Sequence, residues 1–126
     1  MKPRLQFSLL CLGVDEAQGP PTFQHVFQVL PADQYPYRFP PGGGFFVVTG
    51  WTKGSGAHQQ TTRILAGDGT PLADSGEQPF ELADHGGSMV VQFIEGLEFP
   101  EPGGYAVEIG LDGEVVLDYP LVLALA

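Results

Sequence analysis

Apolar and polar residues alternate at the start of the chain, in the stretch "RLQFSLLCLGV" at residues 4–14. Alternation with a period of two is typical of a β-strand that has one face on a hydrophobic core. The apolar positions that share one face are Leu5, Phe7, Leu9 and Cys11. This stretch therefore predicts a first strand whose other face is polar at first and apolar later.

Three further stretches have the composition of strands. "TFQHVFQVL" at residues 22–30 is rich in Thr, Phe and Val, which favour a strand over the short helix that also fits. "GFFVVTGW" at residues 44–51 is a continuous apolar run, as expected of a central strand covered on both faces. "HQQTTRILA" at residues 58–66 follows a glycine-containing loop and ends at the tight turn "GDGT".

The last third of the chain contains one ambiguous segment and one clear hairpin. In "SMVVQFIEGLEF" at residues 88–99, the apolar spacing fits either a helix or a strand over residues 89–97. The β-branched residues and Gly96 favour a strand. Further on, Asp112-Gly113 separates the alternating runs "YAVEIGL" and "EVVLDYPLVLAL", and this dipeptide is a strong hairpin signal.

These runs predict an all-β protein of seven or eight strands separated by turns. Two antiparallel sheets packed face to face satisfy the pattern, and a partly open β-barrel is the alternative. The 126 residues suit a single hydrophobic core, and neither a repeat nor a linker divides them. We therefore expect one sandwich domain over residues 1–126.

The segment "LEFPEPGGYAVEIGLDGEVV" at residues 97–116 resembles the late strands of immunoglobulin-like sandwiches, in which a Pro-Gly turn precedes a strand that opens with tyrosine. Tyr105 corresponds to the corner tyrosine of such folds. Together with "RLQFSLLCLGVDEAQGPPTF" and "FPPGGGFFVVTGW", the segment is similar to a bacterial family of small, uncharacterised single-domain sandwich proteins, a domain of unknown function. The resemblance implies an immunoglobulin-like Greek key over the whole chain, and it supplies no catalytic residue.

The charges of the chain are distributed unevenly along it. The net charge is −10; residues 1–63 carry all five Lys and Arg residues, whereas residues 64–126 carry twelve of the fifteen acidic residues. Five scattered cations cannot form the positive surface that binds nucleic acid or an anionic membrane. We therefore expect no nucleic acid and no membrane among the partners. The acidic excess supports solubility, or forms a face for a basic partner or a cation.

Cys11 is the only cysteine, so no disulfide forms within the chain. Its position in an apolar run favours a buried thiol over a nucleophile. Two cations precede this apolar run, as in a secretory signal, but Gln6 and Ser8 interrupt it and no small-x-small cleavage site follows. We therefore expect a cytoplasmic protein whose N-terminal residues form the first strand.

The sequence contains no recognisable catalytic or cofactor-binding motif. The triple glycine at residues 42–44 is followed by two phenylalanines instead of the Lys-Ser/Thr of a phosphate-binding loop, and there is no Gly-x-Ser-x-Gly nucleophile elbow. His25, His58 and His85 are too far apart for the short spacing of zinc ligands. We therefore expect a protein that is not an enzyme and needs neither a cofactor nor a structural metal.

Glu95, Glu98 and Glu101 are weak candidates for metal ligands. They are spaced three residues apart before the last hairpin, and Ca²⁺ binds carboxylates in such loops. The dense Asp/Asn/Gly pattern of a calcium loop is missing, which favours ordinary acidic residues at strand ends.

The best candidate for a binding site is the stretch "YPYRFPPGGGFFVVTGW" at residues 35–51, which holds 6 of the 14 aromatic residues. The prolines that follow Tyr35 and Phe39 favour an extended backbone. Extended geometry places Tyr35, Tyr37 and Phe39 on one side and Arg38 on the other. The rings either cap the end of the core or form a platform for a sugar, a peptide or a second copy of the chain.

We hypothesise that residues 35–39 contact another protein chain, most simply a second copy, because aromatic residues and Arg are enriched where interfaces carry energy. The function expected from the sequence is a non-catalytic binding or assembly module that forms a homodimer or docks on a protein partner. The alternative is a protein that binds a small ligand such as a sugar or peptide, or an enzyme whose site the sequence does not reveal.

Overall fold

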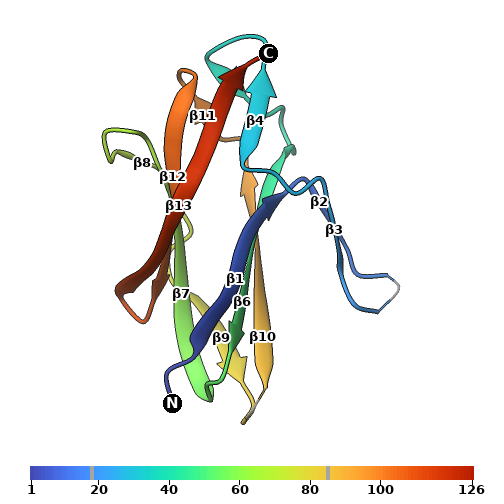
Figure 1. Ribbon diagram of the computed structural model, residues 1–126, viewed down its shortest axis with the longest axis vertical. Coiled ribbons are helices and arrows are strands. Elements are labelled where there is room, and N and C mark those ends of the chain that lie inside the picture. The colour runs from blue at the N-terminus through green and yellow to red at the C-terminus, as the bar shows by residue number, and fades with distance from the viewer. Residues whose placement is uncertain (18, 85) are drawn as a thin grey trace.

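The computed structural model describes residues 1–17, 19–84 and 86–126 (Figure 1). Every regular element within these ranges is a β-strand. The long strands form two layers that face each other (Figure 1). The predicted all-β, two-sheet architecture is therefore confirmed.

One layer is a three-stranded sheet in the order β1 (Arg4–Cys11), β6 (Gly44–Thr52) and β10 (Gly87–Glu95). The other is a six-stranded sheet in the order β4 (Val29–Ala32), β13 (Glu114–Leu125), β12 (Gly103–Leu111), β7 (Gly56–Leu65) and β8 (Pro71–Asp74), with β9 (Gln78–Leu82) also paired to β7. The neighbours are antiparallel except β4 and β13, which are parallel. The strand count exceeds the predicted seven or eight because several strands have only two to five residues.

Two small strand pairs complete the fold. β2 (Gly13–Asp15) and β3 (Thr22–Gln24) form a hairpin that projects from the body of the sandwich (Figure 1). β5 (Tyr37–Arg38) pairs with β11 (Glu98–Phe99). The chain crosses from one layer to the other between β1 and β4, between β4 and β6, between β6 and β7, between β9 and β10, and between β10 and β12. β12 then lies beside β7, which is Greek-key connectivity.

The core lies between the two sheets and is filled from the inner face of each long strand. The side chains that are almost fully buried come mainly from β6, β7, β12 and β13: Phe45, Val47, Trp51, Ile64, Val107, Ile109, Leu121 and Leu123. Burial of apolar surface contributes about 25 cal/mol per Å². The packed layer therefore supplies most of the stabilisation of the sandwich.

Residues 22–30 are not one continuous strand, and the prediction of a single strand there is wrong. β3 ends at Gln24, His25 has a φ of 55°, and β4 begins only at Val29. Between them, the Phe27 N–H donates a hydrogen bond of 2.9 Å to the Leu10 carbonyl. The Phe27 ring packs edge-on against the core residue Phe45 at 6.0 Å. After the break, the partly buried Phe27 side chain packs against the core.

The first strand also differs in one detail from its prediction. A β-bulge lies between Leu5 and Phe7, and a bulge moves the following residues to the opposite face. Leu5 is therefore opposite Trp51, on the core side, whereas Phe7 is opposite Gly50 on the outer side. The sequence pattern shows a period of two but no signal for the extra residue.

The late part of the chain follows its prediction closely. Residues 87–95 form the strand β10, which resolves the ambiguity between helix and strand. Asp112 and Gly113 have positive φ angles of 49° and 89°, as the turn of a two-residue hairpin requires. The Tyr105 hydroxyl donates a 2.6 Å hydrogen bond to the Glu101 carbonyl, four residues upstream. This bond is the tyrosine corner that the resemblance implies.

Candidate functional site

The aromatic side chains of residues 35–39 point towards the core. The Tyr35 hydroxyl donates a 2.7 Å hydrogen bond to the Ala124 carbonyl. Tyr37 packs edge-on against Phe39 with 5.3 Å between ring centroids, and Phe39 is buried. The rings therefore cap the sandwich, as one of the two interpretations of the sequence expects, and burial raises the pKa of the Tyr35 phenol.

Arg38 is the exposed charged side chain of this segment, and in the β5–β11 pair it lies opposite Glu98. The triple glycine turns the chain into β6, with Gly42 at a φ of 81° and the Gly43 N–H bonded to the Pro40 carbonyl at 2.7 Å. A contact between residues 35–39 and another chain stays a prediction. Because the rings point towards the core, such a contact would be made mainly by Arg38 and the neighbouring prolines.

The other candidate groups of the sequence do not meet in space. Within the described residues there is no cluster of three or more His, Cys, Asp or Glu side chains with the geometry of a metal site, so Glu95, Glu98 and Glu101 do not converge. His25 is exposed, and His85 lies outside the described residues.

His58 forms a pair with Asp112 that resembles the His–Asp half of a hydrolase triad. Its Nδ1 lies 2.8 Å from an Asp112 carboxylate oxygen, and its Nε2 lies 2.9 Å from the Ser55 carbonyl oxygen. The second contact occupies the nitrogen that a triad needs for activating a hydroxyl. The hydrogen bonds to Asp112 and Ser55 raise the pKa of His58, and the bond to His58 lowers the pKa of Asp112. The pair therefore fastens the β12–β13 turn to β7.

Sequence reasoning missed the outer face of the three-stranded sheet, which is apolar. Strand register places Leu9, Val48 and Val91 side by side on it, with Phe46 and Phe93 in the next row. The rings of Phe46 and Phe93 lie 4.9 Å apart. Val91 is 37% exposed and Phe93 43% exposed, although both belong to a regular strand. No strand of the six-stranded sheet covers this face.

The face is sheltered at one side only. The Phe7 ring lies over Gly50, where an added Cβ would be only 2.2 Å from it, and Phe7 packs against Phe23 of the β2–β3 hairpin at 6.4 Å. The hairpin therefore covers the β1 side, and the β10 side stays open.

β10 is also the edge strand of its sheet, because it pairs with β6 on one side and has no strand partner among the described residues on the other. The Gly96 N–H donates to the Gly43 carbonyl at 3.0 Å. Hydrogen-bonding positions alternate along an antiparallel ladder. Carried back along β10, this alternation directs the backbone N–H and C=O groups of Met89, Val91 and Phe93 towards the open side.

The edge of β10 lacks the features that protect the other edges. Proteins prevent unwanted pairing at sheet edges with short strands, prolines, charges and bulges. β4, β8 and β9 have four, four and five residues and contain Pro31, Pro71 and Pro79 respectively. β1 contains a bulge, and an isolated bridge joins its Leu10 to Phe27. β10 has nine residues, no proline, an unbroken register and one charge, at Glu95.

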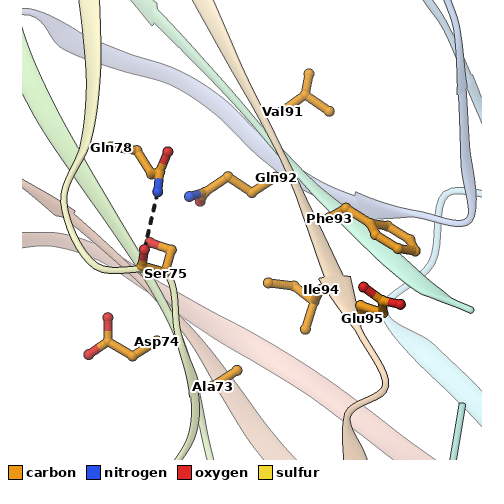
Figure 2. A pocket seen from close by; sticks show the side chains of 9 residues that line it. All are labelled: Ala73, Asp74, Ser75, Gln78, Val91, Gln92, Phe93, Ile94 and Glu95. Carbon is orange, nitrogen blue, oxygen red and sulfur yellow. Dashed lines mark hydrogen bonds between the residues drawn. The ribbon is translucent and has the colours of Figure 1, made fainter. Parts of the chain in front are cut away.

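A groove of about 440 Å³ runs along this open edge (Figure 2). One wall is β10, from which Gln92 and Ile94 point into the groove. The other wall is the end of β8, the connection to β9 and the start of β9, with Ala73, Asp74, Ser75 and Gln78. Polar side chains from both walls approach each other across it: the amide end of Gln92 extends towards Ser75 and Gln78. The Gln78 amide is held by a 3.2 Å hydrogen bond to the Ser75 carbonyl.

Gln92 is held from behind by a polar cluster inside the core. Its carbonyl oxygen accepts a hydrogen bond from the Thr62 hydroxyl and a second, of 3.4 Å, from the Gln60 amide. The Gln60 carbonyl accepts a 2.7 Å bond from the Trp51 indole. Buried polar groups need such partners. The cluster therefore fixes the side chain that forms the floor of the groove.

The three-stranded sheet is almost neutral although the chain is strongly acidic. β1, β6 and β10 together contain one acidic residue, Glu95, and one basic residue, Arg4, against a net charge of −10 for the whole chain. The groove adds Asp74, which pairs with Arg63 at 3.6 Å. The open face and the open edge therefore combine apolar contacts, unpaired backbone groups and weak charge, a combination suited to binding an extended protein segment.

The two facing sheets, the layer crossings and the tyrosine corner define an immunoglobulin-like β-sandwich. The chain belongs to DUF6941, a family of unknown function, whose sequence profile matches residues 6–124. Both findings agree with the resemblance described from the sequence.

Among solved structures, the chain is similar to an immunoglobulin-like protein from Pseudomonas aeruginosa, with 14% identity and a TM-score of 0.44, over 98% of this chain and 97% of the other. A comparison with curated proteins gave no match. Within the described residues, no helix is long and apolar enough to cross a membrane.

Proposed function

We propose that the chain is a non-catalytic binding or assembly module, and that it takes an extended segment of a protein onto the open edge of β10. The observation that carries the proposal is the unprotected edge itself: nine residues without proline or bulge, beside exposed Val91 and Phe93. An extended peptide added to such an edge gains main-chain hydrogen bonds, and its alternate side chains gain contacts.

The groove beside the edge supports the same function. Its volume of about 440 Å³ leaves room for side chains of an added strand. Ser75, Gln78 and Gln92 would hydrogen-bond the polar groups of that strand, and Val91 and Phe93 would cover its apolar ones. The partner is a protein segment of low charge, because the three-stranded sheet offers only Glu95 and Arg4 as charged groups and Asp74 of the groove is paired with Arg63.

A peptide with the sequence of residues 87–95, flanked by lysines for solubility and labelled with fluorescein, is a direct probe of the edge. We expect fluorescence anisotropy to rise saturably with dilute protein, and the rise to vanish with Val91→Lys, which puts a charge on the edge. Val115→Lys is the matched control, because Val115 is 60% exposed at the distant β12–β13 hairpin. Equal binding of the peptide to the Val91→Lys and Val115→Lys variants would contradict the proposal. So would a chain that neither binds the peptide nor associates with a second copy of itself.

A second candidate function rests on the polar floor of the groove. Pockets of about 300–1,000 Å³ with a few convergent polar groups are typical small-ligand sites, and the amides of Gln78 and Gln92 are suited to a sugar hydroxyl or a free peptide. Titration of a panel of monosaccharides and dipeptides by NMR tests it. Shifts confined to Ser75, Gln78 and Gln92 and abolished by Gln78→Leu support this function, and a panel without shifts argues against it.

A further inference from the structure

Resting on the proposed function, we infer that the segment bound at the open edge is β10 of a second copy of the chain. The two β10 strands pair antiparallel about a two-fold axis at Val91. The two three-stranded sheets then form one continuous sheet in the order β1, β6, β10, β10, β6, β1. The sheet has no other long, unprotected strand among the described residues to which a neighbour can add.

Charge favours a second copy at this edge over an approach through the six-stranded sheet. Each copy carries a net charge of −10, so most relative orientations bring like charges together. The other sheet is acidic, with Glu108, Glu114 and Asp118 in β12 and β13. The three-stranded sheet has a single carboxylate, and it lies at the very end of β10. Across the groove the edge also faces Asp74, whose charge is offset by Arg63 at 3.6 Å. Two copies therefore meet with less repulsion across β10 than across the six-stranded sheet.

The sequence of β10 is complementary to itself in this register. A two-fold axis at Val91 places Val91 opposite Val91, and Met89 opposite Phe93 of the second copy, all on the outer face. Glu95 lies opposite Gly87, which has no side chain to collide with it. The two carboxylates are therefore at opposite ends of the interface.

An opposite charge lies near each of these ends. Lys53 is exposed in the turn directly after Thr52, and Thr52 pairs with Gly87. The antiparallel register therefore carries Glu95 of each copy to the end of the sheet where Lys53 of the other lies. Neither residue forms an ion pair in the described part of the chain, so this complementary pair is available to the second copy.

The backbone groups also match. The alternation set by the Gly96–Gly43 bond turns the N–H and C=O groups of Met89, Val91 and Phe93 outwards. With Val91 opposite itself, these three residues form about six backbone hydrogen bonds with the same residues of the second copy. If the two-fold axis lay one residue further along β10, Val91 would no longer lie opposite Val91 of the second copy. The register can therefore be tested chemically.

Disulfide crosslinking tests the register, since hydrogen-bonded antiparallel partners have Cα atoms about 5.5 Å apart, which a disulfide can span. Mild oxidation should link Val91→Cys to itself, and a mixture of Met89→Cys and Phe93→Cys should give the mixed dimer. Met89→Cys alone should not link, because its two copies are about 13 Å apart in this register. Cys11 is fully buried and gives no background. The control Val115→Cys is more exposed than Val91 and should form no disulfide-linked dimer.

Sedimentation velocity of the full chain measures association without oxidation. We expect a concentration-dependent species of twice 13.5 kDa, and we expect Val91→Lys to raise its dissociation constant at least roughly tenfold because like charges then lie directly opposite. Val115→Lys should leave it unchanged. Because Val91 is partly exposed and Val91→Cys nearly preserves the size of the side chain, the Val91→Cys crosslinking result stands even if the lysine variant unfolds.

Two results would overturn the inference. A chain that stays monomeric at millimolar concentration and does not crosslink through Val91→Cys has no such dimer, although binding of the β10 peptide would still support the proposed function. A dimer that survives Val91→Lys but dissociates with Arg38→Glu assigns the interface to the rim segment at residues 35–39. Loss of both peptide binding and association would refute the proposed function itself.

Discussion

Replacement of Gln60 by Met tests the buried polar cluster that holds the groove in place. Gln60 is 0% exposed, and its carbonyl accepts the Trp51 indole N–H at 2.7 Å. Its amide nitrogen donates to the Thr62 hydroxyl at 3.0 Å and reaches Thr49 and Gln92 only at 3.4 Å. Met has nearly the same length and volume as Gln, but its sulfur is only a weak acceptor for the indole N–H and it cannot donate to the hydroxyl.

The expected loss follows from the two short bonds. An indole N–H left buried without an acceptor costs about 1–3 kcal/mol. The lost bond to Thr62 adds about 1 kcal/mol, but Thr62 keeps its own bond to Gln92, and removal of the amide returns part of its desolvation cost. We expect Gln60→Met to lower the free energy of unfolding by about 2–3 kcal/mol.

Urea denaturation followed by Trp51 fluorescence measures this loss, since Trp51 is the only tryptophan. The matched control is Gln59→Met. Gln59 is the neighbouring residue on β7 and its side chain is exposed, so the change should stay within about 0.5 kcal/mol. A Gln60→Met variant as stable as the control would refute the reasoning, because the indole N–H would then have no need of this acceptor.

Three other predictions concern the frame of the site. Because the bonds to Asp112 and Ser55 raise the folded-state pKa of His58, its contribution to stability is complete below about pH 6.5 and is lost as the pH rises through the folded-state pKa. Urea midpoints between pH 6 and 9 should therefore fall for the wild type and fall less for His58→Gln. Equal pH dependence of the two midpoints would contradict this role of His58. Tyr105→Phe removes the 2.6 Å bond to the Glu101 carbonyl and should cost about 1–2 kcal/mol in the same assay, whereas no loss would mean that the corner bond is dispensable. Cys11 is fully buried, and burial raises the pKa of its thiol. Ellman's reagent should therefore label Cys11 only after the chain unfolds. Fast labelling of the native chain would show that the outer face of the three-stranded sheet opens.

The parts of the fold that the sequence predicts correctly depend on local signals. Asp112-Gly113 marks its hairpin because few residues tolerate the positive φ angles of that turn. The alternation in residues 105–111 needs only a buried face to be read correctly. The corner tyrosine bonds a carbonyl four residues away, so its sequence motif contains both partners.

The parts that the sequence does not predict depend on contacts between distant residues. The bulge after Leu5 and the break at His25 follow from how β1, Phe27 and the hairpin pack, and no local residue type marks them. The rings of residues 35–39 suggested a binding platform because their composition matches an interface. Composition cannot distinguish an interface from a core cap, and the Tyr35 bond to Ala124 spans 89 positions of sequence.

The candidate site escaped prediction for a similar reason. Residues 88–94 read as an apolar strand, and such a run fits a strand covered on both faces as well as one that is open. Which strand ends a sheet is decided by non-local pairing, here of β10 with β6 across about forty residues. The lack of proline and charge in β10 is visible in the sequence, but it becomes meaningful only once the strand is known to be an edge.

Amide hydrogen exchange along β10, followed by NMR at several protein concentrations, tests the central claim most directly. In dilute protein the N–H groups of Val91 and Phe93 should exchange quickly, while those of Gln92 and Ile94, which face β6, should be protected. Raising the concentration or adding the β10 peptide should slow Val91 and Phe93 and leave Gln92 and Ile94 unchanged. Protection of Val91 in dilute protein would mean that the edge is already closed, and fast exchange of Val91 under every condition would mean that nothing pairs with it.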